Sequence, residues 1–103
     1  MRYRVIVSRR AEQMLVCHTE FLTRVSIRAA KRLRDEFSGL LDELEREPRS
    51  FPPVLEPKLP GEYCKALFEK RYQAVFCIEG DRVYLDAVLD CRMDNTAYFG
   101  PDN

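Results

Sequence analysis

The sequence predicts an α+β fold in which a helical hairpin covers one face of a four-stranded, mainly antiparallel sheet. Three observations lead to this prediction. A short alternating segment comes first, two amphipathic helical stretches follow, and three short apolar runs at residues 63–68, 72–78 and 82–89 come last. The element order is therefore β-α-α-β-β-β. One sheet with helices packed on a single face buries the apolar surfaces of all six elements.

The first element is a strand over residues 2–7. Basic and apolar side chains alternate there, and Tyr3, Val5 and Val7 share one side of the pattern. The β-branched residues in this segment also favour extended backbone. We therefore expect a strand with one buried face.

Two helices are predicted because apolar residues recur at spacings of three and four. Ser8 can cap the first helix, whose apolar stripe runs through residues 11–25. Ser26 can cap the second, whose stripe covers residues 27–44, and Pro48 forbids its continuation. Because only a turn near Ser26 separates them, the helices must fold back as an antiparallel hairpin.

The last part of the chain begins with a stiff segment and ends with a meander. Residues 48–61 hold five of the six prolines, which predicts an extended surface crossing. Residues 79–81 form a compact hairpin turn between the last two strands. Alternation places Asp86 and Asp90 on the face away from the helices. The predicted helix-facing set is Tyr72, Ala74, Phe76, Ile78, Val83, Leu85, Ala87 and Leu89.

Length and composition limit the function classes. A chain of 103 residues fits one domain, residues 1–103, with a shallow site. No apolar run is long enough for a membrane span and no secretory signal is visible, so we expect a cytoplasmic protein. The four cysteines are widely spaced and there is a single histidine, so we expect reduced thiols and no metal site. Nucleotide-binding motifs are lacking, and we expect no cofactor.

The formal charge of zero hides a strong asymmetry. Residues 1–34 carry nine basic groups against two acidic, a net charge of +7. Arg9 and Arg10 can pair with the acidic end of the second helix, but five cations remain at the hairpin bend. They are either a solvated face or a contact site for an acidic partner or phosphates. This predicted partner-binding cluster, the bend cluster, consists of Arg24, Arg28, Lys31, Arg32 and Arg34.

Residues 65–76 and 84–92, with the preceding helical hairpin, resemble the RelE/ParE toxin superfamily. Its members are the growth-inhibiting toxins of type II toxin-antitoxin modules and include plasmid stabilisation proteins. The resemblance implies a cytoplasmic toxin whose partner is a cognate antitoxin protein. RelE-like members cleave mRNA on the ribosome, and ParE-like members poison DNA gyrase without known catalysis. A degenerate member that only binds its antitoxin is the third possibility, because fold does not choose among these functions.

The resemblance also implies site residues. Lys65 falls on the strand where RelE-like members have lysines, and Arg92 falls at the arginine after the last strand. Tyr98 matches the C-terminal tyrosine of some members. The central strand has Gln73 where an arginine is expected, and Arg71 is the nearby substitute. Alternation would place Arg71 on the same face as Gln73.

These residue types suit RNA cleavage without a metal. Attack by a 2′-hydroxyl needs a base, an acid and cations that stabilise the phosphate. Each candidate also has a structural alternative, such as an ion pair of Arg92 with Asp90 or Asp94. His18 lies on the apolar stripe, which favours a structural histidine. The predicted catalytic set is Lys65, Arg71, Arg92 and Tyr98.

Overall fold

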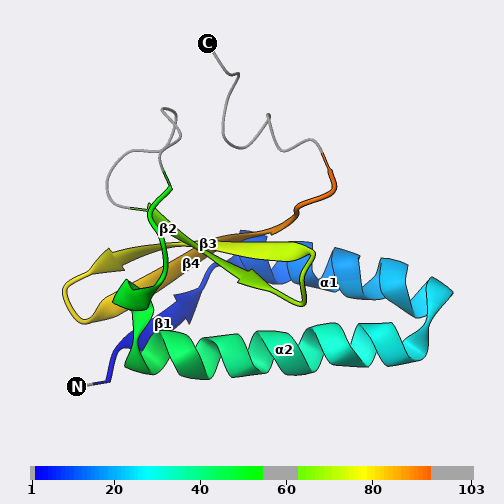
Figure 1. Ribbon diagram of the computed structural model, residues 1–103, viewed down its shortest axis with the longest axis horizontal. Coiled ribbons are helices and arrows are strands. Elements are labelled where there is room, and N and C mark those ends of the chain that lie inside the picture. The colour runs from blue at the N-terminus through cyan, green and yellow to red at the C-terminus, as the bar shows by residue number, and fades with distance from the viewer. Residues whose placement is uncertain (1, 55–62, 94–103) are drawn as a thin grey trace, which may run out of the picture.

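The computed structural model describes residues 2–54 and 63–93 and has the predicted fold class (Figure 1). The elements are β1 (Arg4–Val7), α1 (Arg9–Val25), α2 (Ile27–Arg46), β2 (Tyr63–Phe68), β3 (Tyr72–Glu79) and β4 (Arg82–Asp90), with one 3₁₀ turn at Pro48–Ser50. The four-stranded sheet has the order β1-β4-β3-β2. β1 runs parallel to β4, and the other two pairs are antiparallel, so the sheet is mainly antiparallel as predicted.

Both helices begin at the predicted caps. The hydroxyl oxygen of Ser8 accepts a hydrogen bond from the Ala11 amide at 3.0 Å, and that of Ser26 accepts one from the Ala29 amide at 3.2 Å. These bonds satisfy amides that the first helical turn leaves without a partner. The helices run antiparallel on one side of the sheet (Figure 1). Neither is long and apolar enough to cross a membrane, and this holds for every described helix.

The helices and the sheet share one core. Phe37 on α2 packs against Phe68 on β2, with ring centroids 5.8 Å apart. Burying large apolar side chains between the two layers is the main source of stability in such a fold. The largest contributors from the helix side are Leu33, Phe37, Leu40 and Leu44, and those from the sheet are Tyr72, Phe76, Val83 and Leu85.

α1 also protects one edge of the sheet. β1 ends at Val7, which pairs with Leu85, so no strand of the described residues lies on that side of the rest of β4. α1 takes that place: Nε2 of His18 lies 2.9 Å from the Val88 carbonyl oxygen, and the Ser8 hydroxyl donates to the Asp86 carbonyl at 3.1 Å. Exposed edge carbonyls otherwise invite pairing with other chains. His18 therefore has a structural role, which is the role that its position on the apolar stripe of the first helix favoured.

The alternation of β4 breaks at Asp86. Phe76 on β3 faces Leu85, but the preceding residue Val75 faces Ala87, so the register shifts between them. Asp86 is the extra residue on β4, skipped in the register between Leu85 and Ala87. Such a β-bulge reverses the faces of all residues that follow it.

The bulge makes part of the face assignment wrong. Ala87 and Leu89, expected to face the helices, lie on the face of the sheet away from the helices and form a small buried cluster with Val75. Asp90, expected on the open face, lies opposite Tyr72 and shares its helix-facing side. Composition and periodicity give no sign of the inserted position, so simple alternation placed these residues on the wrong face.

The crossing after α2 is only partly extended. Pro48 is buried and begins the 3₁₀ turn, which departs from the predicted surface crossing. Residues 52–54 then run along β2: the Val54 amide donates to the Tyr63 carbonyl at 2.8 Å, and the Lys65 amide donates to the Pro52 carbonyl at 3.0 Å. The remainder of the predicted crossing, residues 55–61, lies outside the described residues.

The two hairpin turns differ in their strain. Gly80 has a positive φ of 61° in the predicted β3–β4 turn, a conformation that glycine adopts readily. In the β2–β3 turn the positive φ values belong to Glu69 (50°) and Lys70 (61°). Side chains make this conformation costly. Arg32 on α2 contacts Glu69 at 3.6 Å and helps to hold the turn against the helix.

Candidate functional site

Arg92 follows the last strand, and its guanidinium is held by Asp90. Nε and Nη2 of Arg92 donate to the two carboxylate oxygens at 3.1 and 2.9 Å, and the Arg92 amide donates to Oδ1 at 2.9 Å. Asp90 is 8% exposed, whereas the Arg92 side chain is 50% exposed. The hydrogen bonds from Arg92 hold the pKa of Asp90 below its usual value, although burial acts in the opposite direction. Arg92 is therefore in the ion pair that was its structural alternative.

This ion pair lies in a groove of about 600 Å³ between α1 and the ends of β3 and β4. The His18 and Tyr72 rings are 5.0 Å apart. Burial, and then the charge of Asp90, raises the pKa of Tyr72, so its hydroxyl stays protonated at neutral pH. The described lining residues are Cys17, His18, Phe21, Tyr72, Asp90, Arg92 and Met93. Sequence reasoning missed Tyr72 as a neighbour of Arg92, because only the bulge brings Asp90 to its side.

Lys65 and Arg92 lie on opposite sides of the sheet. Lys65 is opposite Val75 and therefore lies on the open face of the sheet. Arg92 lines the groove on the side that the helices cover, together with Tyr72. The sheet thus separates the two cations that were expected to contact one phosphate.

Arg71 and Arg92 both act on Tyr72, unlike Lys65. Arg71 is in the β2–β3 turn and lines a pocket of about 320 Å³ with Leu22 and Tyr72, on the helix side. The expected placement beside Gln73 is wrong, because alternation does not extend into the turn. The charges of Arg92 and Arg71 both act to lower the pKa of Tyr72, after the larger effects of burial and Asp90. Tyr98 lies outside the described residues.

The bend cluster lies at the tip of the helical hairpin, apart from Arg34, which lines a pocket with Glu12 and Thr19 farther along α1. All five of its cations are exposed, and Arg32 is the member that contacts Glu69. The first turn of α2 contains no acidic residue. Val25 and Ile27, on either side of the cap Ser26, are 73% and 65% exposed. The tip therefore combines positive charge with exposed apolar surface, a combination suited to a protein partner.

The opposite end of α2 is acidic and partly neutralised. Nη2 of Arg2 donates to the Glu45 carboxylate at 2.6 Å. Within the described ranges, no three histidine, cysteine or acidic side chains gather in a way that could hold a metal ion.

Comparisons with known proteins agree with this architecture. No family model matches the chain, and no curated protein matches its sequence. Its fold is similar to that of a chain in the solved structure described as "Chromosomal ParDE TA system from P. aeruginosa", with a TM-score of 0.69 and 14% sequence identity. The alignment covers 86% of this chain and 96% of that chain. The likeness shows the fold: this chain has the RelE/ParE-like fold that its sequence resembles.

Proposed function

We propose that this protein is the toxin of a type II toxin-antitoxin module and that it acts by binding DNA gyrase rather than by cleaving mRNA. The toxin role is supported by the fold that it shares with a chain of a ParDE toxin-antitoxin system. The sequence resemblance to the RelE/ParE superfamily points in the same direction. ParE-like members of that superfamily poison gyrase without known catalysis, which makes gyrase the target to test first.

The separation of the predicted catalytic cations supports action without catalysis. Stabilising a phosphate during RNA cleavage needs cations that converge on one point and keep their charge available. Arg92 shares its charge with the buried Asp90, and Lys65 lies on the other face of the sheet. The Asp90 carboxylate would also repel a phosphate beside Arg92. This arrangement of Lys65, Asp90 and Arg92 is the observation that carries the proposal.

The antitoxin is the second partner in the proposal. The exposed cations of the bend cluster suit acidic side chains, and Val25 and Ile27 suit apolar ones. Electrostatic complementarity of this kind mainly sets the association rate and the choice of partner. We therefore assign antitoxin recognition to the hairpin tip.

The mode of action is tested with two assays on the purified protein. Supercoiling by DNA gyrase should be inhibited, while primer extension on a reporter mRNA translated with ribosomes should show no new cleavage sites. Cleaved mRNA would show that the protein is a nuclease and not a gyrase inhibitor. The Arg92→Ala variant would then show whether the groove beside Arg92 is the site of cleavage. If induced expression left growth, supercoiling and mRNA unchanged, the toxin role would be wrong. The protein would then be a degenerate member of the superfamily that only binds its antitoxin.

Antitoxin recognition is tested by charge reversal at the tip. The probe is the protein product of the small reading frame adjacent to this gene, measured by calorimetry. Reversing Arg28 and Arg32 to glutamate should weaken its binding by a factor of about 10 or more and reduce the salt dependence. Arg9→Glu with Arg49→Glu is the matched control, because both residues are exposed and lie away from the tip. Equal losses in the two pairs would exclude the tip as the site.

A further inference from the structure

β2 is an edge strand whose outer side is only half covered. It is the last strand in the order β1-β4-β3-β2. Residues 52–54 pair with its first half, where the Lys65 amide donates to the Pro52 carbonyl at 3.0 Å. The pairing stops there, since Pro52 has no amide hydrogen with which to continue it and Pro48–Ser50 turns away. The second half of β2 pairs with β3 on its inner side, and on its outer side no strand lies beside it among the described residues.

The backbone of Leu67 points out from this uncovered half. Amide and carbonyl groups in a strand alternate between its two sides. Because the Lys65 amide points outward to Pro52, the amide and carbonyl of Leu67, two residues later, also point outward. No described residue takes up either group. The Leu67 side chain is 65% exposed. This is the arrangement that another strand uses when it adds to a sheet.

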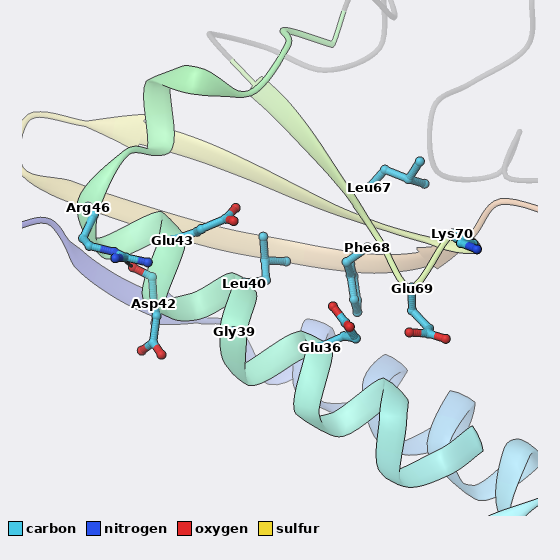
Figure 2. A pocket seen from close by; sticks show the side chains of 10 residues that line it. All are labelled: Glu36, Gly39, Leu40, Asp42, Glu43, Arg46, Leu67, Phe68, Glu69 and Lys70. Atoms are coloured by element: carbon cyan, nitrogen blue, oxygen red, sulfur yellow. Dashed lines mark hydrogen bonds between the residues drawn. The ribbon is translucent and has the colours of Figure 1, made fainter. Parts of the chain in front are cut away.

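A groove lies between this edge and α2. Figure 2 shows Leu40 and Glu43 of α2 pointing toward β2, with Glu69 and Lys70 at the end of the strand. The groove has a volume of about 510 Å³. Gly39 lies on its helical wall, and a β-carbon added there would meet nothing within 4 Å. A glycine inside a helix costs about 0.5–1 kcal/mol relative to alanine, and here it leaves room above the helix backbone.

The charges around the groove select the kind of partner. Three carboxylates face it, those of Glu36, Glu43 and Glu69, against the two cations of Arg46 and Lys70, whereas Figure 2 shows the carboxylate of the lining residue Asp42 pointing away from β2. The groove is therefore acidic overall, in contrast to the hairpin tip. A segment with basic side chains would be attracted to it, and an acidic one repelled.

We propose that the edge of β2 is a docking site for an extended, basic segment of a partner protein. The segment adds as a fifth strand, bonds to the Leu67 amide and carbonyl, and places alternate side chains over Gly39. Its basic groups meet Glu36 and Glu43. This site is separate from the hairpin tip, and it does not depend on whether the protein is a toxin.

The test uses a synthetic capped peptide of about eight residues in which valine alternates with lysine, a length typical of a strand. Binding is followed by NMR titration and by hydrogen exchange of single amides. Exchange of the Leu67 amide should slow by a factor of about 10 or more at saturation, because a new hydrogen bond protects it. The same peptide with glutamate in place of lysine should bind at least about 10-fold more weakly. Equal binding of both peptides would overturn the proposed chemistry of the partner.

Variants locate the site. Gly39→Leu fills the groove and should weaken binding of the lysine peptide by a factor of about 10 while keeping the fold, since leucine favours helix. Ser38→Leu is the matched control, because Ser38 is exposed on α2 and does not line the groove. Leu67→Pro removes the outward amide but no bond to β3, whereas Leu67→Ala keeps that amide. Of these two Leu67 variants, only Leu67→Pro should lose binding of the lysine peptide.

Two further results would overturn the proposal. Full binding by the Gly39→Leu variant would place the peptide elsewhere. Self-association in sedimentation experiments that Leu67→Pro abolishes would make a second copy of this chain the occupant of the edge, rather than a basic partner. Thermal unfolding of each variant shows that the comparison is made on folded protein.

Discussion

The end of β4 and the tip of the helical hairpin both carry exposed cations, but these cations have different partners. At the end of β4, Arg92 makes a bidentate ion pair with the buried Asp90. At the tip, Arg28 is exposed in the first turn of α2, where there is no acidic residue. The amides at a helix start carry partial positive charge, so a cation there is unfavourable by a few tenths of a kcal/mol.

This difference separates a structural cation from one that is available to a partner. Arg92 compensates a buried carboxylate, so its removal should affect folding first. Arg28 compensates no charge of the helix end and slightly destabilises α2, so the fold alone does not explain it. The comparison therefore favours the proposed partner surface at the tip and predicts a mainly stabilising role for the β4 end.

The comparison requires that α2 is firmly docked, so that the tip holds its cations in fixed positions. Phe37→Ala tests this, because Phe37 is 8% exposed and packs against Phe68. We expect a loss of about 3–5 kcal/mol in the free energy of unfolding, measured in a denaturant melt. Phe21→Ala is the control, since Phe21 is 57% exposed and should lose less than about 1 kcal/mol. A similar small loss for both would mean that α2 is not docked as described.

The second prediction concerns the structural cation. Arg92→Ala should lower the free energy of unfolding at neutral pH by about 1 kcal/mol, because the buried Asp90 loses its charged partner while Arg92 itself is half exposed. The pKa of Asp90 is lowered in the folded state, so its ionised form stabilises the protein above the usual carboxylate pKa. That stabilisation is lost as the pH falls through the lowered value.

The expected signature is a stability difference that depends on pH. The free energies of unfolding of the parent and Arg92→Ala should differ fully at neutral pH and converge in acid, as Asp90 becomes protonated in both. Urea melts across this pH range measure the difference. A constant difference at all pH values would show that Arg92 acts through packing rather than through Asp90.

The sequence predicted the layers of this fold well, because strong local signals define them. Ser8 and Ser26 cap the two helices, Pro48 lies just beyond the second, and Gly80 provides the β3–β4 turn. Each of these signals acts within a few residues of its own position. The register of β3 against β4 does not, because it depends on a bulge that only packing determines.

That single bulge explains why the candidate site was predicted less well than the fold. Without it, Asp90 would lie on the open face with Lys65, and Arg92 could join a set of cations there. With the bulge, Asp90 lies beside Tyr72 and holds Arg92 on the helix-facing side of the sheet. The edge of β2 was also not foreseen, since it depends on where the Pro52 pairing stops.

The third prediction compares ion pairs in the two regions. Arg32 and Glu69 are 3.6 Å apart, with side chains 56% and 21% exposed. A double-mutant cycle with Arg32→Gln and Glu69→Gln should give a coupling energy of no more than about 0.5 kcal/mol. The corresponding cycle for Asp90 and Arg92 should give the larger value. If the Arg32 pair were the stronger, the tip would be held by its charges and would not count as an available surface.

The smallest effect has the opposite sign. Arg28→Glu replaces a cation in the first turn of α2 by an anion, which the partial positive charge of the helix start favours. The free energy of unfolding should rise by about 0.3 kcal/mol in low salt, and the gain should shrink as salt is added. Thermal unfolding at several salt concentrations measures it, with Arg28→Gln as the control that removes charge without reversing it. If Arg28 both destabilises its own helix and strengthens antitoxin binding, its role is to bind the partner and not to stabilise the fold. If Arg28→Glu lowered stability, an undetected contact would hold Arg28, and the contrast with Arg92 would fail.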